Sequence, residues 1–163
     1  FGGYDEKNIS IKIVKILNNI SFKLNIFIQT NLRKKINNIS SKNNIFFFNH
    51  KNYLKTLKSS NIAITAGGMG LFDGLYLNKK IICIPQYKHQ EINAKKISIK
   101  KAISLIKIKD KNFKNKFNQL FLKIYKSKIK EKKLITLQKK IINISKLRKT
   151  SKLIFNLYDK SKY

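Results

Sequence analysis

The fold is decided by the stretch IAITAGGMGLFDGL, residues 62–75, where an apolar run passes through glycines into a second apolar pattern. Residues 62–65 have the continuous apolar character of a strand buried on both faces, and residues 71–77 follow with helical spacing. Three of the four residues at 67–70 are glycine. A strand that enters a helix through such a turn is typical of α/β domains, which bind ligands beyond the carboxyl ends of their strands.

Strands and helices are expected to alternate on both sides of this stretch. Apolar residues with helical spacing at 9–20 are followed by strand-like alternation at 22–28, and the same exchange then repeats along the chain. We expect strands at 22–28, 45–48, 62–65, 81–84 and 102–106, with helices at 9–20, 32–36, 53–57, 71–77 and 92–97. The short connections predict a Rossmann-like α/β fold, a parallel sheet with helices on both faces.

The two ends of the chain depart from this alternation. From Phe113 on, the apolar spacing is helical throughout, in stripes at 113–124, 134–144 and 147–158. We therefore expect a Rossmann-like domain at residues 1–110 and a helical C-terminal extension at residues 111–163 that packs on the same domain. The chain opens with Phe1 and two glycines, as a chain does when it is cut just after a buried strand. The sheet is therefore expected to be truncated at its first strand.

The composition is strongly basic, with 35 Lys against 2 Arg and a formal net charge of +30. Such a charge would favour polyanions through counterion release. However, Lys, Ile and Asn together make half of the chain, as A+T-rich codons would produce, and the planar fork of Arg that reads phosphates and base edges is nearly absent. Nucleic acid is therefore disfavoured as a partner. The basic amphipathic helices after residue 113 leave contact with the inner face of an anionic membrane as an alternative.

Cys83 is the only cysteine and lies inside the apolar run 81–84, so we expect it in the core. A lone cysteine excludes a disulfide framework and a cysteine metal site. No apolar run reaches the roughly 18 residues that spanning a bilayer requires. We expect a cytoplasmic protein that uses no cofactor and no metal.

Two glycine-rich loops lead from a strand into a helix, at residues 1–8 and 65–70. Glycine lets the backbone approach a ligand and adopt positive φ, and a helix N-terminus offers N–H groups to an anion. Both loops are candidate phosphate-binding loops, although glycines also make ordinary turns. The second matches neither the P-loop nor the dinucleotide-binding fingerprint. The ligand class that stays compatible with this loop is a nucleotide diphosphate held mainly by backbone N–H groups. At Gly68, a side chain would block the approach of the diphosphate and would resist a positive φ.

Polar side chains near these loops are candidates for contacting the rest of the ligand. Asp73 lies one turn into the helix after the second loop, where its carboxylate can accept hydrogen bonds from a ribose diol or simply complement the helix dipole. His89, Gln90 and Asn93 follow the next strand and can share one face of a loop and helix. His50 also follows a strand, and both histidines can equally be surface residues.

Three motifs in chain order resemble the C-terminal domain of glycosyltransferase family 28, namely FGGYDxxN at 1–8, IAITAGG at 62–68 and HQxxNA at 89–94. Within the family the sequence is most similar to predicted glycosyltransferases of the spore-coat-polysaccharide type and to the UDP-diacetamido-trideoxy-sugar hydrolase of pseudaminic acid synthesis. The resemblance covers residues 1–107 well and the helical tail in outline. It implies the C-terminal half of a GT-B fold, in which two Rossmann-like domains flank a cleft and this one binds the nucleotide sugar.

The resemblance also implies roles for single residues. Gly2 and Gly3 would border the diphosphate, while His89, Gln90 and Asn93 would approach the sugar or a phosphate. The residues that would offer backbone N–H groups to the diphosphate are Gly67, Gly68, Met69 and Gly70.

Two positions depart from the family pattern. Asp73 stands where the family usually has a glutamate that binds ribose, and its side chain is shorter. Gly70 stands where relatives often have a Ser or Thr hydroxyl, so phosphate binding would depend on the backbone alone.

The resemblance implies a glycosyltransferase that takes a UDP-sugar donor in surface-glycan synthesis. Its catalytic residue is unknown, because the base and the acceptor site commonly lie in the N-terminal domain, which would here be a missing domain or a partner subunit. Two related alternatives are a UDP-sugar hydrolase and the donor-binding subunit of a split transferase. An alternative of another class is a basic nucleic-acid- or lipid-binding protein in which the sheet is only a scaffold.

Overall fold

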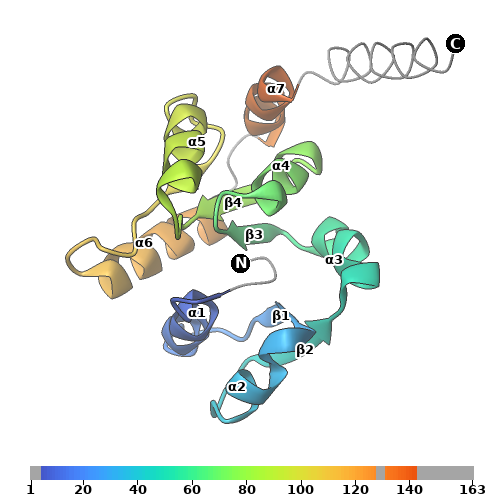
Figure 1. Cartoon of the computed structure of the whole chain (residues 1–163), viewed down its shortest axis with the longest axis vertical. Helices are drawn as coiled ribbons and strands as arrows, with labels where there is room; N and C mark the ends of the chain where they lie inside the picture. Colours follow the sequence, from blue (N-terminus) through green and yellow to red (C-terminus); the bar gives the residue numbers. More distant parts are fainter. Residues whose placement is uncertain (1–4, 128–130, 143–163) are drawn as a thin grey trace, which may run out of the picture.

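The computed structural model describes residues 5–127 and 131–142 of the chain. Over these ranges, strands and helices alternate as predicted, with helices on both sides of the strands (Figure 1). The strands are β1 (Asn25–Gln29), β2 (Asn44–Phe48), β3 (Ile62–Thr65), β4 (Lys80–Cys83) and β5 (Ser104–Leu105). The helices are α1 (Ile9–Leu17), α2 (Arg33–Asn37), α3 (Tyr53–Ser59), α4 (Met69–Tyr76), α5 (Lys88–Ser98), α6 (Phe113–Lys126) and α7 (Glu131–Ile141), with 3₁₀ turns η1 (Thr30–Leu32) and η2 (His50–Asn52).

Strand β3 matches its predicted range, whereas the strands predicted at 22–28 and 102–106 are shorter in the structure. β1 begins only at Asn25, because Phe22 turns toward α6 and stacks on Tyr125 with ring centroids 4.4 Å apart. β5 keeps two residues, and the carbonyl of Ala102 before it accepts a hydrogen bond from Gln138 of α7 instead of joining a ladder. The stripe predicted at 147–158 lies outside the described residues.

All strand pairs are parallel, which confirms the Rossmann-like class, but the described strands form two sheets. β1 pairs with β2, and β3 pairs with β4, which pairs with β5. A single sheet was expected, and the interruption lies between β1 and β3. Helix α1 bridges the two sheets, since Ile13 packs in the cluster that contains Ile82 of β4 and Val14 packs with Ile28 of β1.

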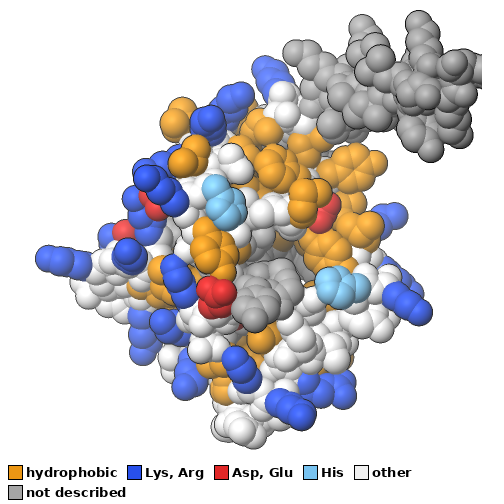
Figure 2. All heavy atoms as spheres, viewed as in Figure 1, with side chains coloured by type: hydrophobic (Ala, Val, Ile, Leu, Met, Phe, Trp, Pro, Cys, Tyr) orange, Lys and Arg blue, Asp and Glu red, His pale blue; other side chains and the backbone are white. Residues whose placement is uncertain are grey.

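The face seen in Figure 2 is basic at its periphery and more apolar toward its middle and upper part. Several large apolar side chains of the described residues are exposed around the ends of α3, α4 and the β4–α5 loop: Leu54, Met69, Phe72, Tyr76, Tyr87 and Ile92. Within residues 5–127 and 131–142, no helix has the length and apolarity that crossing a membrane requires.

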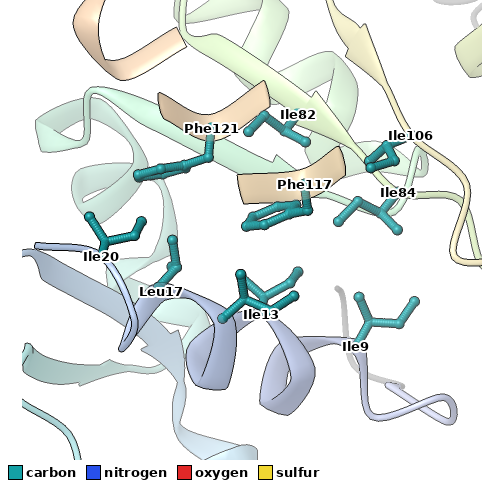
Figure 3. Close-up of a cluster of buried hydrophobic side chains, with 10 residues drawn as sticks. Ile9, Ile13, Leu17, Ile20, Ile82, Ile84, Ile106, Phe117 and Phe121 are labelled. Atoms are coloured by element: carbon teal, nitrogen blue, oxygen red, sulfur yellow. The ribbon is translucent and has the colours of Figure 1, made fainter. Parts of the chain in front are cut away.

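Strand β4 lies at the centre of the larger core because its alternating side chains are buried on both faces. Ile82 and the following Ile84 pack in one cluster with residues of α1 and with Phe117 and Phe121 of α6 (Figure 3). Cys83 points to the opposite face, as predicted for a core residue, and burial raises the pKa of its thiol to about 12. Each such fully buried apolar side chain contributes about 1.5–3 kcal/mol, so α6 is an integral part of the core.

Helix α7 packs on the other face of the same sheet through apolar and polar contacts. Leu137 and Ile141 pack against the cluster of α4, α5 and β4. Gln138 is fully buried, and its Nε2 donates to the carbonyl of Lys79 at 2.8 Å and to that of Ala102 at 3.2 Å. The two strand-end carbonyls are thereby satisfied away from water.

Candidate functional site

The turn after β3 contains one glycine whose φ angle requires it. Gly67 is buried with φ of +94°, and a Cβ there would lie 3.1 Å from the backbone oxygen of Gln90 and 3.2 Å from Cys83 Sγ. Residues other than glycine rarely adopt this conformation. Gly68 has φ of −88°, so the prediction of positive φ at Gly68 is wrong and applies to its neighbour.

Gly68 is the N-cap residue of α4 and has open space beside it. A Cβ there would meet only Gln90 Nε2, at 3.9 Å. The backbone N–H of Leu71 bonds to the Gly68 carbonyl at 3.0 Å, whereas the N–H groups of the first helical residues have no partner inside a helix. Met69 is 76% exposed and does not cover them. The start of α4 can therefore present backbone N–H groups to an anion.

Because Gly70 has no side chain, there is room beside it for the side chain of Tyr53 from α3. A Cβ at Gly70 would lie 3.1 Å from Tyr53 Oη and 3.3 Å from Thr65 Oγ1. The family resemblance implies a Ser or Thr hydroxyl near position 70, and here the Tyr53 hydroxyl from α3 lies close to that position. Backbone is therefore not the only hydrogen-bonding group beside this turn.

Tyr53 and Asp73 form a half-buried pair at the same place. The Tyr53 hydroxyl donates to Asp73 Oδ2 at 3.0 Å. Burial, followed by the adjacent Asp73 carboxylate, raises the pKa of the Tyr53 phenol above its ordinary value, so the phenol stays protonated and remains a donor. Asp73 Oδ1 remains as an acceptor, which is compatible with a ribose hydroxyl.

Gln90 connects two strand-end loops. Its Oε1 accepts from the backbone N–H of Gln86 at 3.0 Å and, more weakly, from that of Tyr87 at 3.4 Å. Its Nε2 faces the open side of Gly68. Because the oxygen is committed to the backbone, the amide nitrogen is the part of Gln90 that a ligand at Gly68 would meet.

These groups meet at one end of a cavity of about 470 Å³ that extends between β1 and β3. Its polar end lies at the carboxyl ends of the strands, while its remaining walls come mostly from apolar side chains of α1, β1, α3 and β3, with Ser10, Thr56 and Ser60 among them. The residues at the polar end are Gln29, His50, Tyr53, Thr65, Gly68, Gly70, Asp73 and Gln90. None of the described residues that line the cavity is a lysine or arginine, so among them Asp73 carries the one full charge.

The structure separates the three predicted residues of the β4–α5 segment. Gln90 lines the cavity, whereas His89 and Asn93 are exposed on α5 and do not. His89 stacks on the ring of Tyr87 with centroids 5.8 Å apart. His50 does line the cavity, and its Nε2 lies 3.1 Å from Gln29 Nε2. A ligand role for His89 and Asn93 stays a prediction.

At the first predicted phosphate loop, a carboxylate of the chain itself occupies the start of the following helix. Both carboxylate oxygens of Asp5 accept backbone N–H groups at the start of α1, from Ile9 and from Ser10, each at 2.8 Å. These N–H groups are therefore not open to a phosphate. Gly2 and Gly3 lie outside the described residues. In the described part of the chain, no three His, Cys, Asp or Glu side chains are grouped as metal ligands would be.

Sequence reasoning missed Tyr53, which it treated only as part of a helix. Its contact with Asp73 joins residues 20 positions apart on two helices. No local sequence pattern predicts a contact between two such residues. The one usable signal in the sequence was a tyrosine at the first position of a helix that follows a strand.

Residues 7–154 match the sequence profile of the glycosyltransferase family 28 C-terminal domain. The chain belongs to this family. A search of curated protein sequences gave no match.

Solved structures similar to this family 28 domain are also glycosyltransferases. The spinosyn rhamnosyltransferase SpnG complexed with spinosyn aglycone aligns with a TM-score of 0.68 and 16% identity over 84% of this chain and 37% of that one. SpnG complexed with thymidine diphosphate aligns at 0.65 and 17% over 81% and 36%. A glycotransferase of kitacinnamycin aligns at 0.59 and 17% over 80% and 34%. The likeness shows the fold of a GT-B C-terminal half, and the chain spans about a third of each protein.

Proposed function

We propose that this family 28 domain binds the nucleoside diphosphate part of a UDP-sugar that serves as donor for sugar transfer. The observation that carries the proposal is the open backbone at Gly68 and the start of α4, next to the Tyr53–Asp73 pair at the carboxyl end of β3. A fold neighbour was solved with thymidine diphosphate, which supports a nucleoside diphosphate as the ligand class. Surface-glycan synthesis is the role that the resemblance suggests.

We assign the diphosphate to the turn because backbone N–H groups are open to it there. The N–H groups at Gly68, Met69 and Gly70 can approach an anion without an intervening side chain. The partial positive charge at the start of α4 adds to this attraction. The Gln90 Nε2 amide, on the open side of Gly68, is a further donor for a phosphate or sugar oxygen.

The ribose is placed at Asp73, whose Oδ2 is held by Tyr53. This bond orients the carboxylate, so Asp73 Oδ1 can accept from a ribose hydroxyl, and charged acceptors form the stronger hydrogen bonds. Asp73 has a shorter side chain than the glutamate of the family pattern, and the hydrogen bond from Tyr53 compensates for this by holding the carboxylate in place.

In the transfer reaction these groups would stabilise the leaving group. The acceptor oxygen bonds to the anomeric carbon and gives its proton to the catalytic base, while the bond between the anomeric carbon and the diphosphate oxygen breaks and negative charge develops on UDP. Preorganised N–H groups that face this oxygen stabilise the developing charge. A water in place of the acceptor would give hydrolysis with the same donor loops, so this domain supports both reactions equally.

The acceptor site and the catalytic base are assigned to an N-terminal domain or partner subunit. The exposed apolar residues Leu54, Met69 and Phe72 lie beside the polar end of the cavity and offer a surface on which a second domain can pack. That domain would close the cleft over the donor. A basic periphery that contacts an anionic membrane at the cytoplasmic face is compatible with this arrangement.

The test compares UDP, UMP and inorganic phosphate by isothermal titration calorimetry at two salt concentrations. At both salt concentrations, we expect UDP to bind at least about tenfold more tightly than phosphate. Salt screens the attraction between the anion and the basic surface, whereas the contacts to the diphosphate and the ribose persist. If UDP and phosphate bind equally, and both bindings vanish at moderate salt, the lysine-rich surface rather than the site accounts for binding.

A further inference from the structure

Helix α5 has apolar residues on two opposite sides, and only one of these sides is buried. Ala94 and Ile97 are buried in the cluster that α5 shares with α4 and β4. Ile92 and Ile99 lie on the other side, where they are 46% and 80% exposed. Neither belongs to a core cluster of the described residues. The packing of the domain therefore does not account for isoleucine at these two positions.

Lysines flank the two exposed isoleucines on both sides. At about 100° per residue, Ile92 and Ile99 lie about 20° apart around the helix axis. Two lysines lie about 40° and 60° to one side of Ile92, and a third lies about 40° to the other side. The exposed lysines of the helix and of the turn that follows it are Lys88, Lys95, Lys96, Lys100 and Lys101. In Figure 1, α5 lies at the edge of the molecule, and in the same region of Figure 2 apolar side chains lie between lysines.

The one acidic residue at positions 88–101 is Glu91, and lysines of the chain neutralise it. Its carboxylate lies 2.6 Å from Lys107 Nζ and 3.1 Å from Lys95 Nζ. The exposed face of α5 is therefore positive and complements an anionic surface. Its isoleucines favour a bilayer over a nucleic acid, because their methyl groups can enter the boundary between headgroups and acyl chains, whereas a phosphate backbone offers them no apolar contact.

Helices α6 and α7 also carry lysines, but they lack an apolar centre of this kind. Their apolar stripes pack in the core through Phe117, Phe121, Leu137 and Ile141. The large apolar side chain exposed on α6 is Tyr125, whose ring stacks on Phe22. The described parts of α6 and α7 thus present charge without an exposed aliphatic side chain, whereas α5 presents both.

We propose that the outer face of α5, formed by Ile92, Ile99 and the lysines around them, binds an anionic lipid bilayer. The helix lies along the membrane surface, the isoleucines enter the headgroup region, and the lysines contact the headgroup phosphates. This inference does not depend on the proposed UDP site, because neither isoleucine lines the cavity. Gln90 lies on the opposite side of α5 from Ile92, so a bilayer on this face leaves Gln90 uncovered.

The first test measures cosedimentation of the chain with vesicles of phosphatidylcholine, either alone or with about 30% phosphatidylglycerol. We expect binding to the anionic vesicles only. The double variant Ile92→Ser/Ile99→Ser should weaken this binding at least about fivefold, since it removes apolar area and no charge. An unchanged Tm shows that the variant is folded. Unchanged vesicle binding by the folded variant would overturn the proposal.

A matched pair of lysine variants separates the face of α5 from the net charge of the chain. Lys96→Gln/Lys100→Gln should weaken vesicle binding at least about fivefold, whereas Lys114→Gln/Lys123→Gln on α6 removes the same charge and should weaken it less than about twofold. Equal losses in the two double variants would overturn the proposal, because binding would then follow net charge alone.

A tryptophan reporter tests whether α5 itself enters the membrane. The chain contains no tryptophan, so a single introduced indole gives an unambiguous emission. On anionic vesicles, the emission of Ile99→Trp should move to shorter wavelength and be quenched at least about twofold by brominated lipids, whereas Lys114→Trp should show neither change. The same response at both positions would overturn the proposal. Binding of a single-stranded RNA that depends equally on Ile92 and Ile99 would also overturn it, because the face would then serve a nucleic acid.

Discussion

Gly67 and Gly68 are adjacent but are glycines for different reasons. Gly67 has φ of +94° and no space for a side chain, so the fold requires it. Gly68 has an ordinary φ and open space beside it, and we propose that the approach of a ligand to its backbone is what favours glycine there. The two positions therefore separate stability from binding.

Gly67→Ala is expected to lower Tm by roughly 2–8 °C, since the left-handed conformation costs about 1–2 kcal/mol and each kcal/mol corresponds to about 2–4 °C in a chain of this size. Gly68→Val should change Tm by less than about 2 °C and weaken UDP binding at least about tenfold. Thermal unfolding and calorimetry on both variants check this. A folded Gly68→Val variant with unchanged UDP affinity would show that the turn does not hold the diphosphate.

The Tyr53–Asp73 pair gives a second prediction at this scale. Asp73→Asn should weaken UDP binding by about tenfold, because a neutral oxygen is a poorer acceptor for ribose hydroxyls, and should affect a 2′,3′-dideoxyuridine diphosphate less. Tyr53→Phe should act in the same direction and more weakly, through loss of the bond that orients the carboxylate. Asp110→Asn, away from the cavity, is the control. Equal losses for both nucleotides in Asp73→Asn would contradict the ribose role.

At the scale of elements, the sequence predicted what local patterns determine. β3 is observed at its predicted residues because its apolar run and glycine turn are both local signals. The interruption between β1 and β3 could not be predicted from periodicity, since strand pairing depends on contacts between distant residues. Gln90 could be predicted as a site residue because it follows a strand. That Gln90 lines the cavity while His89 and Asn93 do not depends on how α5 is oriented on the sheet, which the sequence pattern does not give.

Helix α7 supplies a prediction about an element. Gln138 is its one fully buried polar side chain among the described residues, and it satisfies the carbonyls of Lys79 and Ala102. Gln138→Ala should lower the free energy of unfolding by about 1–3 kcal/mol, the desolvation penalty of carbonyls left without a donor. Chemical denaturation measures it. Lys139→Ala, at an exposed position of the same helix, is the control for helix propensity, and a Gln138→Ala variant as stable as the control would show that α7 docks by apolar contacts alone.

At the scale of the whole molecule, the net charge of +30 and the site are separate features. The lysines lie toward the periphery in Figure 2, while no lysine or arginine of residues 5–127 and 131–142 lines the cavity. In the proposed function, charge would account for long-range attraction of anions, and the turn and the Tyr53–Asp73 pair would account for selection.

Residues 1–163 alone are therefore expected to bind a UDP-sugar and to release UDP from it no faster than buffer does, because the acceptor and base are assigned elsewhere. A coupled assay for free UDP measures this over hours at a protein concentration above the Kd. Addition of an N-terminal domain, fused or separate, should restore release. Turnover by the chain alone would place the catalyst among His50, His89 and Asp73.

The most direct measurement of the central claim maps UDP onto the backbone by amide chemical shifts of the ¹⁵N-labelled chain. The account predicts that the largest, saturable changes fall at Gly67–Gly70 and Asp73, with Gln90 next, and that inorganic phosphate does not reproduce the change at Asp73. Changes confined to the lysine-rich faces of α6 and α7, with none at Gly67–Gly70, would contradict it.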